Sequence, residues 1–484
     1  MDTYQLTLLT DLYELTMMQG YFKTGNDETV VFDVFYRENP SGSGYAITCG
    51  LSQVIDYIKN LSFSYEDIDY LRSLDLFEED FLEYLAGYHF TGDIYAIPEG
   101  TVVFPMEPLL KVVAPMTEAQ LIETAILNII NHQSLIATKA SKVVYAAGGS
   151  GVMEFGLRRA QGPDAGTYGA RAAIIGGCDG TSNVLAGKMF HVPVLGTHAH
   201  SWIMSFEDEY TAFRTYADLY PDACILLADT YDTLRSGVPN AIRVFEELRD
   251  NGKMPAKYGI RLDSGDLAYL SKKSRMMLDE AGFCDAVISA SGDLDETIIT
   301  SLKAQGAPIT SWGVGTKLIT SADCPAFGGV YKLAASRRDD QEDFSAKIKI
   351  SENPLKITNP GNKTIFRIYD KETGKIRGDL ICLTGESYDP NVDLVIFDPL
   401  ATWKKLRILG RTYALRELLV PIFKKGQCVY ESPSTMDIKD YCRQELETLW
   451  DESRRLVNPQ DVYVDLSVPL YELKKQLLDQ KHQK

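Results

Sequence analysis

The stretch ACILLADTYDTLRSGVPNAIRVFEELRDNGKMPAKYGIRLD, residues Ala223 to Asp263, decides the expected fold. It opens with a short apolar run, passes through a helix-like segment at Pro239–Gly252 and closes with a second apolar run that begins at Tyr258. Two strands joined through a helix pair in parallel, because the crossover helix returns the chain to the same end of the sheet. The stretch therefore predicts a β-α-β unit with polar residues just past each strand.

The same alternation continues on both sides of this unit, from about residue 150 to about residue 335. A second helix-like stretch lies at Glu207–Tyr220. Further short apolar runs begin at residues 152, 172, 192, 286, 308 and 329. Together with the two strands above they give about eight candidates, the number found in a closed (β/α) barrel, and so favour a barrel over an open sheet.

The first 140 residues have a mixed texture. Thr10–Phe22 looks helical, Thr29–Arg37 looks like a strand, and Gly92–Pro115 reads as short β segments broken by Pro and Gly. Thr117–Gly148 reads as one long helix that starts with a Thr-x-x-Gln capping box. We expect an N-terminal α+β domain over residues 1–140, followed by the barrel over residues 141–335.

The last third of the chain is polar and rich in β patterns at first. Strand-like runs at Ala346–Ser351, Thr364–Asp370 and Asp379–Thr384 alternate with turn sequences. We expect residues 336–410 to complete the N-terminal domain, and residues 411–484 to form a charged helical extension.

Composition narrows the class of partner. The 484 residues carry a net charge of −18, which argues against nucleic acid or an anionic membrane but leaves room for a local phosphate pocket. The eight cysteines contain no C-x-x-C pair, and several lie in apolar runs, as expected of buried free thiols in a reducing compartment. The N-terminus does not resemble a signal peptide, and no apolar run is long enough to span a membrane. We expect a cytoplasmic protein.

Polar, glycine-rich segments follow nearly every candidate strand. Active sites of α/β barrels lie at this carboxyl end of the strands. Each segment alone is typical of a turn, but their recurrence on one rim predicts a site. The segments are Glu154–Gly162, Gly176–Asn183, Gly196–Trp202, Ala228–Thr233, Arg261–Asp266, Ala290–Asp295 and Gly313–Leu318.

The chemistry of this rim suits a phosphorylated ligand. Backbone N–H groups and the hydroxyl of Gly313–Thr316 suit a phosphate at a helix N-terminus. Arg158 and Arg261 supply guanidinium donors for phosphate or carboxylate, and Phe155 offers a flat face for a ring. Oxygen ligands for ribose hydroxyls or for the waters of Mg²⁺ come from three carboxylates, Asp229, Asp263 and Asp293.

Two of the six histidines, His198 and His200, lie one residue apart in the segment GTHAHSW. In an extended strand both side chains point to one face, so a metal clamp, a catalytic pair and ordinary strand residues are all open interpretations. A catalytic zinc site needs three protein ligands. Of the remaining histidines only His191 lies in the barrel segment, and it precedes its strand. A metal site at His198 and His200 would therefore lack a third histidine ligand.

Two common nucleotide motifs are missing. GTSNVLAGKM, residues 180–189, lacks the hydroxyl that follows lysine in a Walker loop, so ATP, if used, is held in another way. The chain also lacks an apolar strand that ends in two acidic residues before a Gly-Thr turn, since its one Asp-Asp pair, at 339–340, follows AASRR. This excludes the commonest fold that binds 5-phosphoribosyl pyrophosphate (PRPP).

Seven motifs between residues 10 and 318 together resemble the nicotinate phosphoribosyltransferase family. In chain order they are TDLYELTM, FDVFYRENP, EFGLRRAQG, GGCDGTSNVLAG, GTHAHSW, RLDSGDL and GVGTKL. The resemblance implies an irregular (β/α) barrel of the type II phosphoribosyltransferase kind, a β-rich second domain and a homodimer. It also implies synthesis of nicotinate mononucleotide and pyrophosphate from nicotinate and PRPP, the first step of NAD salvage from nicotinate. In the family this reaction needs Mg²⁺, is coupled to ATP hydrolysis through a phosphohistidine and is classed as a carbon–nitrogen ligation.

The resemblance also assigns roles to residues. It places the phosphohistidine at His200, leaves His198 on a variable position, and matches Asp229 to an aspartate that orients the histidine in the related nicotinamide enzyme. Phe155 and Arg158 match residues that contact the pyridine ring. Two residues match contacts made across the dimer, Tyr13 to the ring and Arg37 to phosphate. The PRPP pocket is matched by Arg261, Asp263, Gly292, Asp293, Gly313, Gly315 and Thr316.

Selectivity for the ring depends on the stretch GTSN at Gly180–Asn183. The nicotinamide enzyme has an aspartate where Ser182 lies here, and serine can donate to the carboxylate of nicotinate without adding a charge. The alternative interpretation is that this stretch only caps a helix. The family's occasional C-terminal zinc cluster is not supported by the scattered Cys382, Cys428 and Cys442.

Three other functions stay open at this point. A barrel metallohydrolase would carry bound zinc or manganese. A nucleotide-binding or scaffold protein would bind PRPP without turnover. Within the same enzyme class, nicotinamide is the rival substrate.

Overall fold

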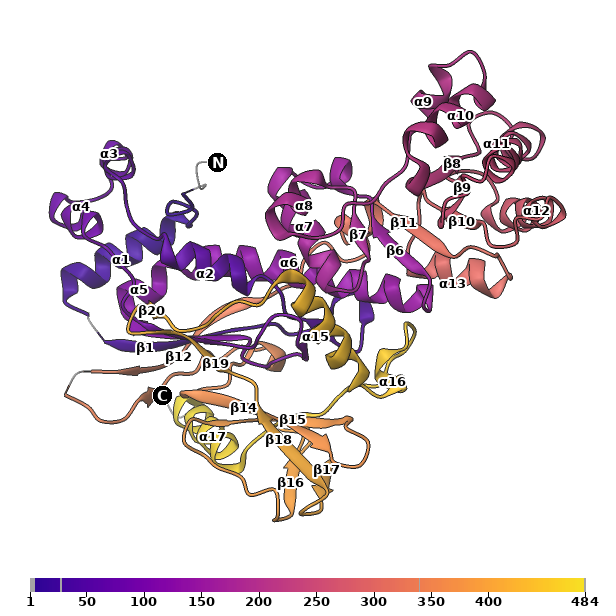
Figure 1. The fold of residues 1–484 in the computed structure, drawn as a ribbon. Helices are drawn as coiled ribbons and strands as arrows, with labels where there is room; N and C mark the ends of the chain where they lie inside the picture. Colours follow the sequence, from indigo (N-terminus) through magenta and orange to yellow (C-terminus); the bar gives the residue numbers. More distant parts are fainter. Residues whose placement is uncertain (1–4, 27, 339, 483–484) are drawn as a thin grey trace. The chain divides into compact units, whose positions relative to one another are not determined.

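The computed structural model describes residues 5–26, 28–338 and 340–482 (Figure 1). The chain divides into two compact units. Unit 2 contains Ile136–Pro325 with the short segment Ser434–Lys439, and unit 1 contains the chain before and after these segments. Helix α6 (Glu123–Ala147) contains the first boundary between the units.

Unit 2 is built on a six-stranded parallel sheet with the order β7-β6-β11-β10-β9-β8. Because every pair is parallel, all six carboxyl ends lie at one edge. The strands are β6 (Gly151–Glu154), β7 (Gly180–Thr181), β8 (Cys224–Leu227), β9 (Tyr258–Leu262), β10 (Val287–Ala290) and β11 (Ser311–Val314). The sheet is the curled half-barrel of the expected fold class, and it ends at β7 and β8.

Helices follow the strands of unit 2, as the alternation predicts. Their starts are fixed locally: Asn183, Asp208, Asp266 and Asp295 cap α8, α10, α12 and α13 with side-chain oxygens that accept backbone N–H groups. The helices are α7 (Pro163–Ile175), α8 (Val184–Phe190), α9 (His200–Met204), α10 (Glu209–Leu219), α11 (Val238–Asp250), α12 (Leu267–Glu280), α13 (Glu296–Ala304) and α14 (Thr316–Ile319).

The prediction of eight barrel strands was wrong in detail. The run at 172 lies inside α7, a helix of small and apolar residues buried on most sides, which apolarity alone does not distinguish from a strand. The run at 192 contributes one isolated bridge, Thr181 to Val194. The run at 329 forms β12 (Val330–Arg337), which pairs with β1 of unit 1.

Unit 1 contains an antiparallel sheet with the order β13-β12-β1-β5-β3-β19-β20. Its strands are β1 (Thr29–Phe35), β3 (Asp93–Ala96), β5 (Leu110–Pro115), β12, β13 (Ser345–Ala346), β19 (Val420–Lys424) and β20 (Gln427–Cys428). Five helices come from the first part of the chain: α1 (Leu12–Thr24), α2 (Leu51–Lys59), α3 (Tyr65–Ser73), α4 (Glu79–Ala86) and α5 (Met116–Leu121).

The C-terminal part of unit 1 carries a second sheet with the order β18-β14-β15-β21. These strands are β14 (Lys363–Asp370), β15 (Ile376–Leu383), β18 (Tyr413–Glu417) and β21 (Val464–Leu466). Two smaller pairs are β2 (Ala46–Ile47) with β4 (Val102–Val103) and β16 (Leu394–Phe397) with β17 (Lys405–Ile408). The later helices are α15 (Thr435–Glu447), α16 (Asp451–Arg454) and α17 (Val468–His482).

Three expectations for these regions need correction. The long helix at 117–148 is split at Ile122 into α5 and α6, and α5 starts after Pro115 without the capping box. Within 346–351 only Ala346 belongs to a strand, β13. The tail after 410 is not purely helical, since β19 and β20 form a hairpin whose turn residues Lys425 and Gly426 both have positive φ.

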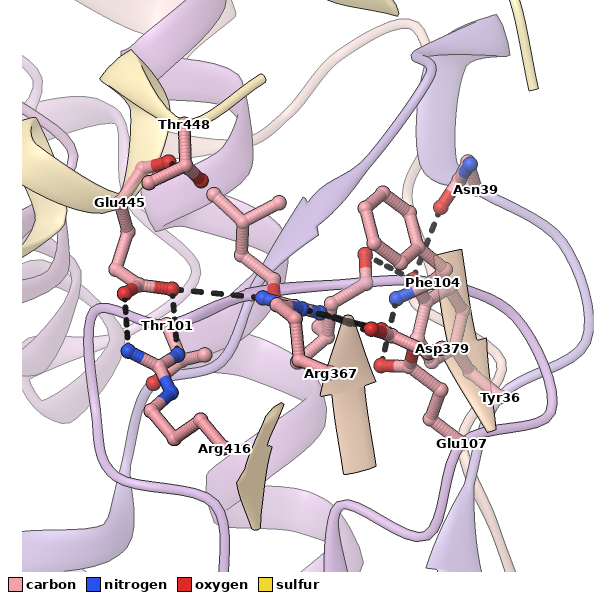
Figure 2. Close-up of polar contacts among 12 residues, drawn as sticks. Tyr36, Asn39, Thr101, Phe104, Glu107, Arg367, Asp379, Arg416, Glu445 and Thr448 are labelled. Atoms are coloured by element: carbon pink, nitrogen blue, oxygen red, sulfur yellow. Dashed lines mark hydrogen bonds and ion pairs between the residues drawn. The ribbon is translucent and has the colours of Figure 1, made fainter. Parts of the chain in front are cut away.

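A fully buried arginine connects the four-stranded sheet of unit 1 to strand β4 and helix α15 (Figure 2). Arg367 on β14 binds Asp379 on β15 through Nε (2.9 Å) and a terminal nitrogen (2.6 Å), and its other terminal nitrogen donates to the carbonyl of Val102 (2.7 Å). It also lies 3.4 Å from Glu445 of α15, which is clasped on its other side by Arg416 (2.7 and 3.0 Å). Every charge here has a partner of opposite sign.

Candidate active site

His200 stands at the start of α9, on the carboxyl edge of the unit 2 sheet. Its Nδ1 is 3.0 Å from the hydroxyl of Thr230, just past β8, and its Nε2 is 3.8 Å from Oδ2 of Asp263, just past β9. The side chain is 39% exposed. The imidazole is therefore held at Nδ1 by Thr230, while Nε2 faces Asp263 and the ring stays open to a ligand.

His198 has a different environment. It is buried, its ring packs 4.6 Å from that of Tyr216, and its Nε2 accepts the backbone N–H of Leu227 (3.3 Å). Burial lowers the pKa of His198 to about 4, so the ring is neutral at pH 7. Its Nε2 lone pair is occupied by the backbone, which leaves the two histidines without a shared metal-binding face.

Asp229, at the end of the β8 segment, supports the neighbouring loop. Its Oδ2 accepts the backbone N–H of Asp263 (2.8 Å) and the hydroxyl of Ser264 (2.7 Å). Its Oδ1 is buried and has no hydrogen-bond partner within the described part of the chain. The group on Nδ1 of His200 is Thr230, so the predicted orienting contact from Asp229 is not the one this structure displays.

Arg261 on β9 crosses toward the histidine segment. It donates to the hydroxyl of Thr197 and to the carbonyl of His198 (3.3 Å), and lies 3.6 Å from Asp263. Burial lowers the pKa of the Arg261 guanidinium, nearby carboxylates raise it, and the positive charge of Arg158 lowers it again. A guanidinium whose buried Nε has no partner among the described residues suits a polyanion such as a phosphate.

Phe155 and the glycine loop after β11 fit closely. A Cβ on Gly313 would lie 2.5 Å from the Phe155 ring, so only glycine lets the ring lie against this strand. Gly315 would place its Cβ 3.3 Å from the Phe155 carbonyl, and the N–H of Phe155 binds the carbonyl of Val314 (2.8 Å). The ring-contact and phosphate-contact motifs of the sequence are thus neighbours.

The turn after β10 also requires glycine. Gly292 has φ +107°, and a Cβ there would lie 2.7 Å from the carbonyl of Asp263. Asp293 is exposed next to it. Thr316 starts α14 and is exposed, and the adjacent Lys317 pairs with Asp295 at 2.7 Å. These residues complete a rim of backbone N–H groups, carboxylates and cations.

Ser182 lies past the end of β7, and its N–H binds the carbonyl of Glu154 (3.0 Å). Asn183 caps α8, so the helix-capping interpretation of this stretch is correct for that residue. Ser182 itself does not cap the helix and is half-buried. Its predicted contact with a ring substituent stays a prediction.

Tyr13 and Arg37 belong to unit 1. Tyr13 lies on α1 and is 44% exposed, and Arg37 follows β1 with a buried Nε that has no partner among the described residues. Their predicted contacts across a dimer stay predictions.

Several site residues escaped the sequence reasoning. Thr197, Thr230, Ser264 and Ser291 supply hydroxyls to Arg261, His200, Asp229 and Asp263. Each lies inside a rim segment, but nothing in the letter pattern says which carboxylate or nitrogen its hydroxyl meets. Glu154 is the other residue missed; it is fully buried at the end of β6.

Two negative findings hold for residues 5–26, 28–338 and 340–482. No group of three or more His, Cys, Asp or Glu side chains there is arranged to hold a metal ion. None of the helices there combines the length and apolarity that a membrane crossing demands.

Comparison with known proteins matches three parts of the chain to one family. Residues 8–131 match the N-terminal domain of nicotinate phosphoribosyltransferase (NAPRTase), residues 151–333 the NAPRTase family, and residues 362–474 its C-terminal domain. The chain belongs to the nicotinate phosphoribosyltransferase family.

Similarity to individual proteins agrees with this family. The nicotinate phosphoribosyltransferase of Bacillus subtilis is 48% identical over 463 residues, covering 96% of this chain and 93% of that protein. The crystal structure of human nicotinic acid phosphoribosyltransferase is similar with a TM-score of 0.81 at 28% identity, over 97% of this chain and 99% of that one. A nicotinate-nucleotide pyrophosphorylase from Pyrococcus furiosus shares the fold (TM-score 0.67, 22% identity, 93% and 99% coverage).

Membership in the nicotinate phosphoribosyltransferase family covers both groups of predicted site residues. The rim segments from Glu154 to Leu318 lie within the match at 151–333, and Tyr13 and Arg37 lie within the match at 8–131. The expected fold class is confirmed, with a half-barrel of six strands in place of a full count of eight.

Proposed function

We propose that this chain joins nicotinate to the phosphoribosyl group of PRPP, releasing pyrophosphate, as the first step of NAD salvage from nicotinate. The bond from ribose C1 to the pyrophosphate oxygen breaks, and a bond from C1 to the pyridine nitrogen forms. The observation that carries the proposal is that the Phe155 ring against the Gly313 loop, Arg261 and His200 share one carboxyl edge, where His200 lies between Thr230 and Asp263.

The residues have complementary tasks in this reaction. Phe155 offers a face for the pyridine ring, and Arg158 offers a cation for the carboxylate of nicotinate. Arg261 and the N–H groups of the Gly313–Thr316 loop face the phosphates of PRPP. The pyridine nitrogen already carries a lone pair, so the site needs no strong base to activate it.

We further propose that ATP hydrolysis is coupled through His200. The γ-phosphoryl group of ATP leaves ADP and forms a P–N bond to the imidazole, and water later releases it as phosphate. If Nδ1–H donates to the hydroxyl of Thr230, the Nε2 lone pair is free to attack. Phosphoryl transfer depends mainly on positioning and on nearby cations, which the Thr230 contact on Nδ1 of His200 and the guanidinium of Arg261 support.

We propose that Mg²⁺ enters with the substrate phosphates, since the carboxylates of the described rim form no cluster of three or more ligands. Oδ1 of Asp229 is buried without a partner in the described chain, and Asp263 and Asp293 lie on the adjoining loops, so these carboxylates would hold the ion or its waters. When bound with substrate phosphates, Mg²⁺ would supply neutralisation of the departing pyrophosphate.

A homodimer with a shared site is part of the proposal. Exposed apolar side chains gather on α1 (Leu12, Tyr13 and Met17) and on α8 with the loop after it (Val184, Met189 and Val194). Apolar groups in such runs are typical of surfaces that a partner covers. Mixing inactive Tyr13→Ala and Arg158→Ala subunits should restore part of the activity, since a mixed dimer regains one intact site. No recovery after confirmed subunit exchange would contradict sharing.

A cytoplasmic location completes the proposal. All eight cysteines are free thiols, and most of them are buried, as is usual in a reducing compartment.

One assay tests the reaction itself. Purified chain is incubated with nicotinate, PRPP and Mg²⁺, with and without ATP, and mononucleotide formation is measured. We expect nicotinate mononucleotide in both cases and faster formation with ATP. Nicotinamide in place of nicotinate should give little product. Binding of PRPP without product, or preference for nicotinamide, would contradict the proposal.

A further inference from the structure

Glu154 joins the two segments that carry the proposed pyridine contacts. It is the last residue of β6, and its side chain is 0% exposed. Phe155 and Arg158 follow it directly along the chain, and Ser182 lies past the neighbouring strand β7. No family match or sequence motif gives this residue a role.

Three hydrogen bonds that Glu154 accepts connect these segments. Oε1 accepts the N–H of Gly156, within the Phe155–Arg158 segment. Oε2 accepts the hydroxyl of Thr181 (2.6 Å), and the backbone carbonyl accepts the N–H of Ser182 (3.0 Å). One residue therefore holds the loop after β6 and the loop after β7 at a fixed distance from each other.

The surroundings are built for this carboxylate. A Cβ on residue 156 would lie 2.8 Å from Oε1, so Gly156 permits the close approach. The hydroxyl oxygen of Thr181 also accepts the N–H of Asn183 (3.0 Å), which commits its hydrogen to Glu154. Burial raises the pKa of Glu154, and the bonds from Thr181 and Gly156 lower it.

We propose that Glu154 is a positioning residue that sets the width of the pyridine pocket by clamping the Phe155–Arg158 segment to the Thr181–Ser182 segment. This inference rests on the proposed function. Both carboxylate oxygens are used by the clamp, so Glu154 does not touch the ring and acts through Phe155, Arg158 and Ser182. The ligand it serves is a flat pyridine carboxylate, whose binding depends on the separation of the two segments.

Glutamine in place of Glu154 keeps the size but replaces one acceptor with a donor. Its amide NH₂ can face the Thr181 oxygen, but the Thr181 hydroxyl hydrogen then loses its acceptor, so the clamp is weakened. Thr181→Val removes the hydroxyl from the other side, and Thr181→Ser keeps it. Glu154→Gln and Thr181→Val therefore weaken the same link without replacing a ring-contact residue, and Thr181→Ser is their control.

Glu118 provides a matched control in unit 1. It is also buried, and it accepts one backbone N–H and one hydroxyl, both from Thr91 (2.6 and 2.7 Å). Glu118→Gln should therefore lower the melting temperature about as much as Glu154→Gln while leaving both KM values unchanged.

The test is steady-state kinetics with nicotinate and PRPP varied separately. We expect Glu154→Gln and Thr181→Val to raise KM for nicotinate about tenfold and KM for PRPP by less than about twofold, because only the ring contacts move. Thr181→Ser should behave as wild type. Parallel changes in both KM values, or an unchanged KM for nicotinate in folded Thr181→Val, would overturn the inference.

Phe155→Ala separates this inference from the proposed function. If Phe155→Ala raises KM for nicotinate and the clamp variants do not, the proposed pocket stands and the clamp is wrong. If wild-type chain does not turn over nicotinate at all, the proposed function fails and the clamp fails with it.

Discussion

Two arginines with little exposed surface differ in how completely the fold pairs them: Arg367 in unit 1 and Arg261 in unit 2. Arg367 in unit 1 is fully buried, and its hydrogen bonds run to carboxylates and to the carbonyl of Val102. Arg261 in unit 2 is 14% exposed, its Nε has no partner in the described chain, and the positive charge of Arg158 helps to lower its pKa. The fold therefore supplies Arg367 with acceptors for its N–H groups, whereas Nε of Arg261 is left without one among the described residues.

The pKa directions follow this difference. Burial would lower the pKa of Arg367, but Asp379 and Glu107 raise it well above its usual value. For Arg261 burial is the largest effect and the pKa is lowered. His198 and His200 repeat the contrast within one segment, since the first is packed and neutral and the second is half-exposed between Thr230 and Asp263. Arg367 and His198 are packed into the fold, whereas Arg261 and His200 keep part of their surface open at the edge of the sheet.

The largest expected effect is the loss of stability when Arg367 is replaced. Arg367→Met leaves Asp379 buried without its cation, while Glu445 keeps Arg416, so we expect a loss of about 3–5 kcal/mol in the free energy of unfolding. Urea unfolding followed by circular dichroism measures it. A loss near zero would show that the network is not needed for the stability of unit 1.

The buried histidine should make stability depend on pH. Its unfolded pKa is about 6.5 and its folded pKa about 4, so below about pH 6.5 the unfolded chain takes up a proton that the folded chain refuses. The contribution of His198 is therefore complete above pH 6.5 and is lost as pH falls toward 4, by about 3 kcal/mol in total. His198→Gln keeps an acceptor for Leu227 and removes the titration.

Unfolding free energies of wild type and His198→Gln, measured between pH 7.5 and pH 4.5, test this directly. The difference between the two should change with pH in the stated direction. A constant difference would mean that His198 is not buried and neutral.

Replacing Arg261 should lower activity and leave stability nearly unchanged, the opposite of the result expected for Arg367. Arg261→Met removes a proposed phosphate contact, so we expect kcat/KM for PRPP to fall about 100-fold, or about 2.7 kcal/mol. Its free energy of unfolding should stay equal or rise slightly, because an incompletely paired buried cation is lost. Parallel loss of stability and activity would erase the contrast with Arg367.

The smallest expected effect concerns the ring pocket. Ser182→Asp places a second carboxylate near that of nicotinate, and we expect KM for nicotinate to rise about tenfold or more through repulsion. Ser182→Ala is the control for size and should change it less. A folded Ser182→Asp variant with unchanged preference for nicotinate would place selectivity elsewhere.

The sequence predicted the parallel strands well where apolar runs ended at turns. Strands β8, β9, β10 and β11 lie where such runs were found. Strand β7 has only two residues and exists because Glu154 and Thr181 pair, which no local pattern reveals. The apolar run in α7 was misread because a helix buried on most sides lacks a polar face.

The site was predictable to the level of segments. Parallel strands bring their carboxyl ends to one edge, so the segments of His200, Arg261 and Asp263 had to meet. Which hydroxyl contacts which nitrogen depends on side-chain rotamers and on the paths of the loops. The contact of Thr230 with Nδ1 of His200 could therefore not be predicted from the sequence. The same is true of Glu154, whose importance lies in the two loops that it bonds.

The central claim is that the unsatisfied edge of unit 2 carries the phosphoryl group on His200. Chain incubated with ATP labelled in the γ-phosphate and with Mg²⁺ should acquire label that is lost in acid and kept in base. His200→Ala should lose the label and the stimulation by ATP while keeping slow PRPP-dependent synthesis, and His198→Gln should keep the label. Label that survives in His200→Ala, or that disappears only in His198→Gln, would contradict the account.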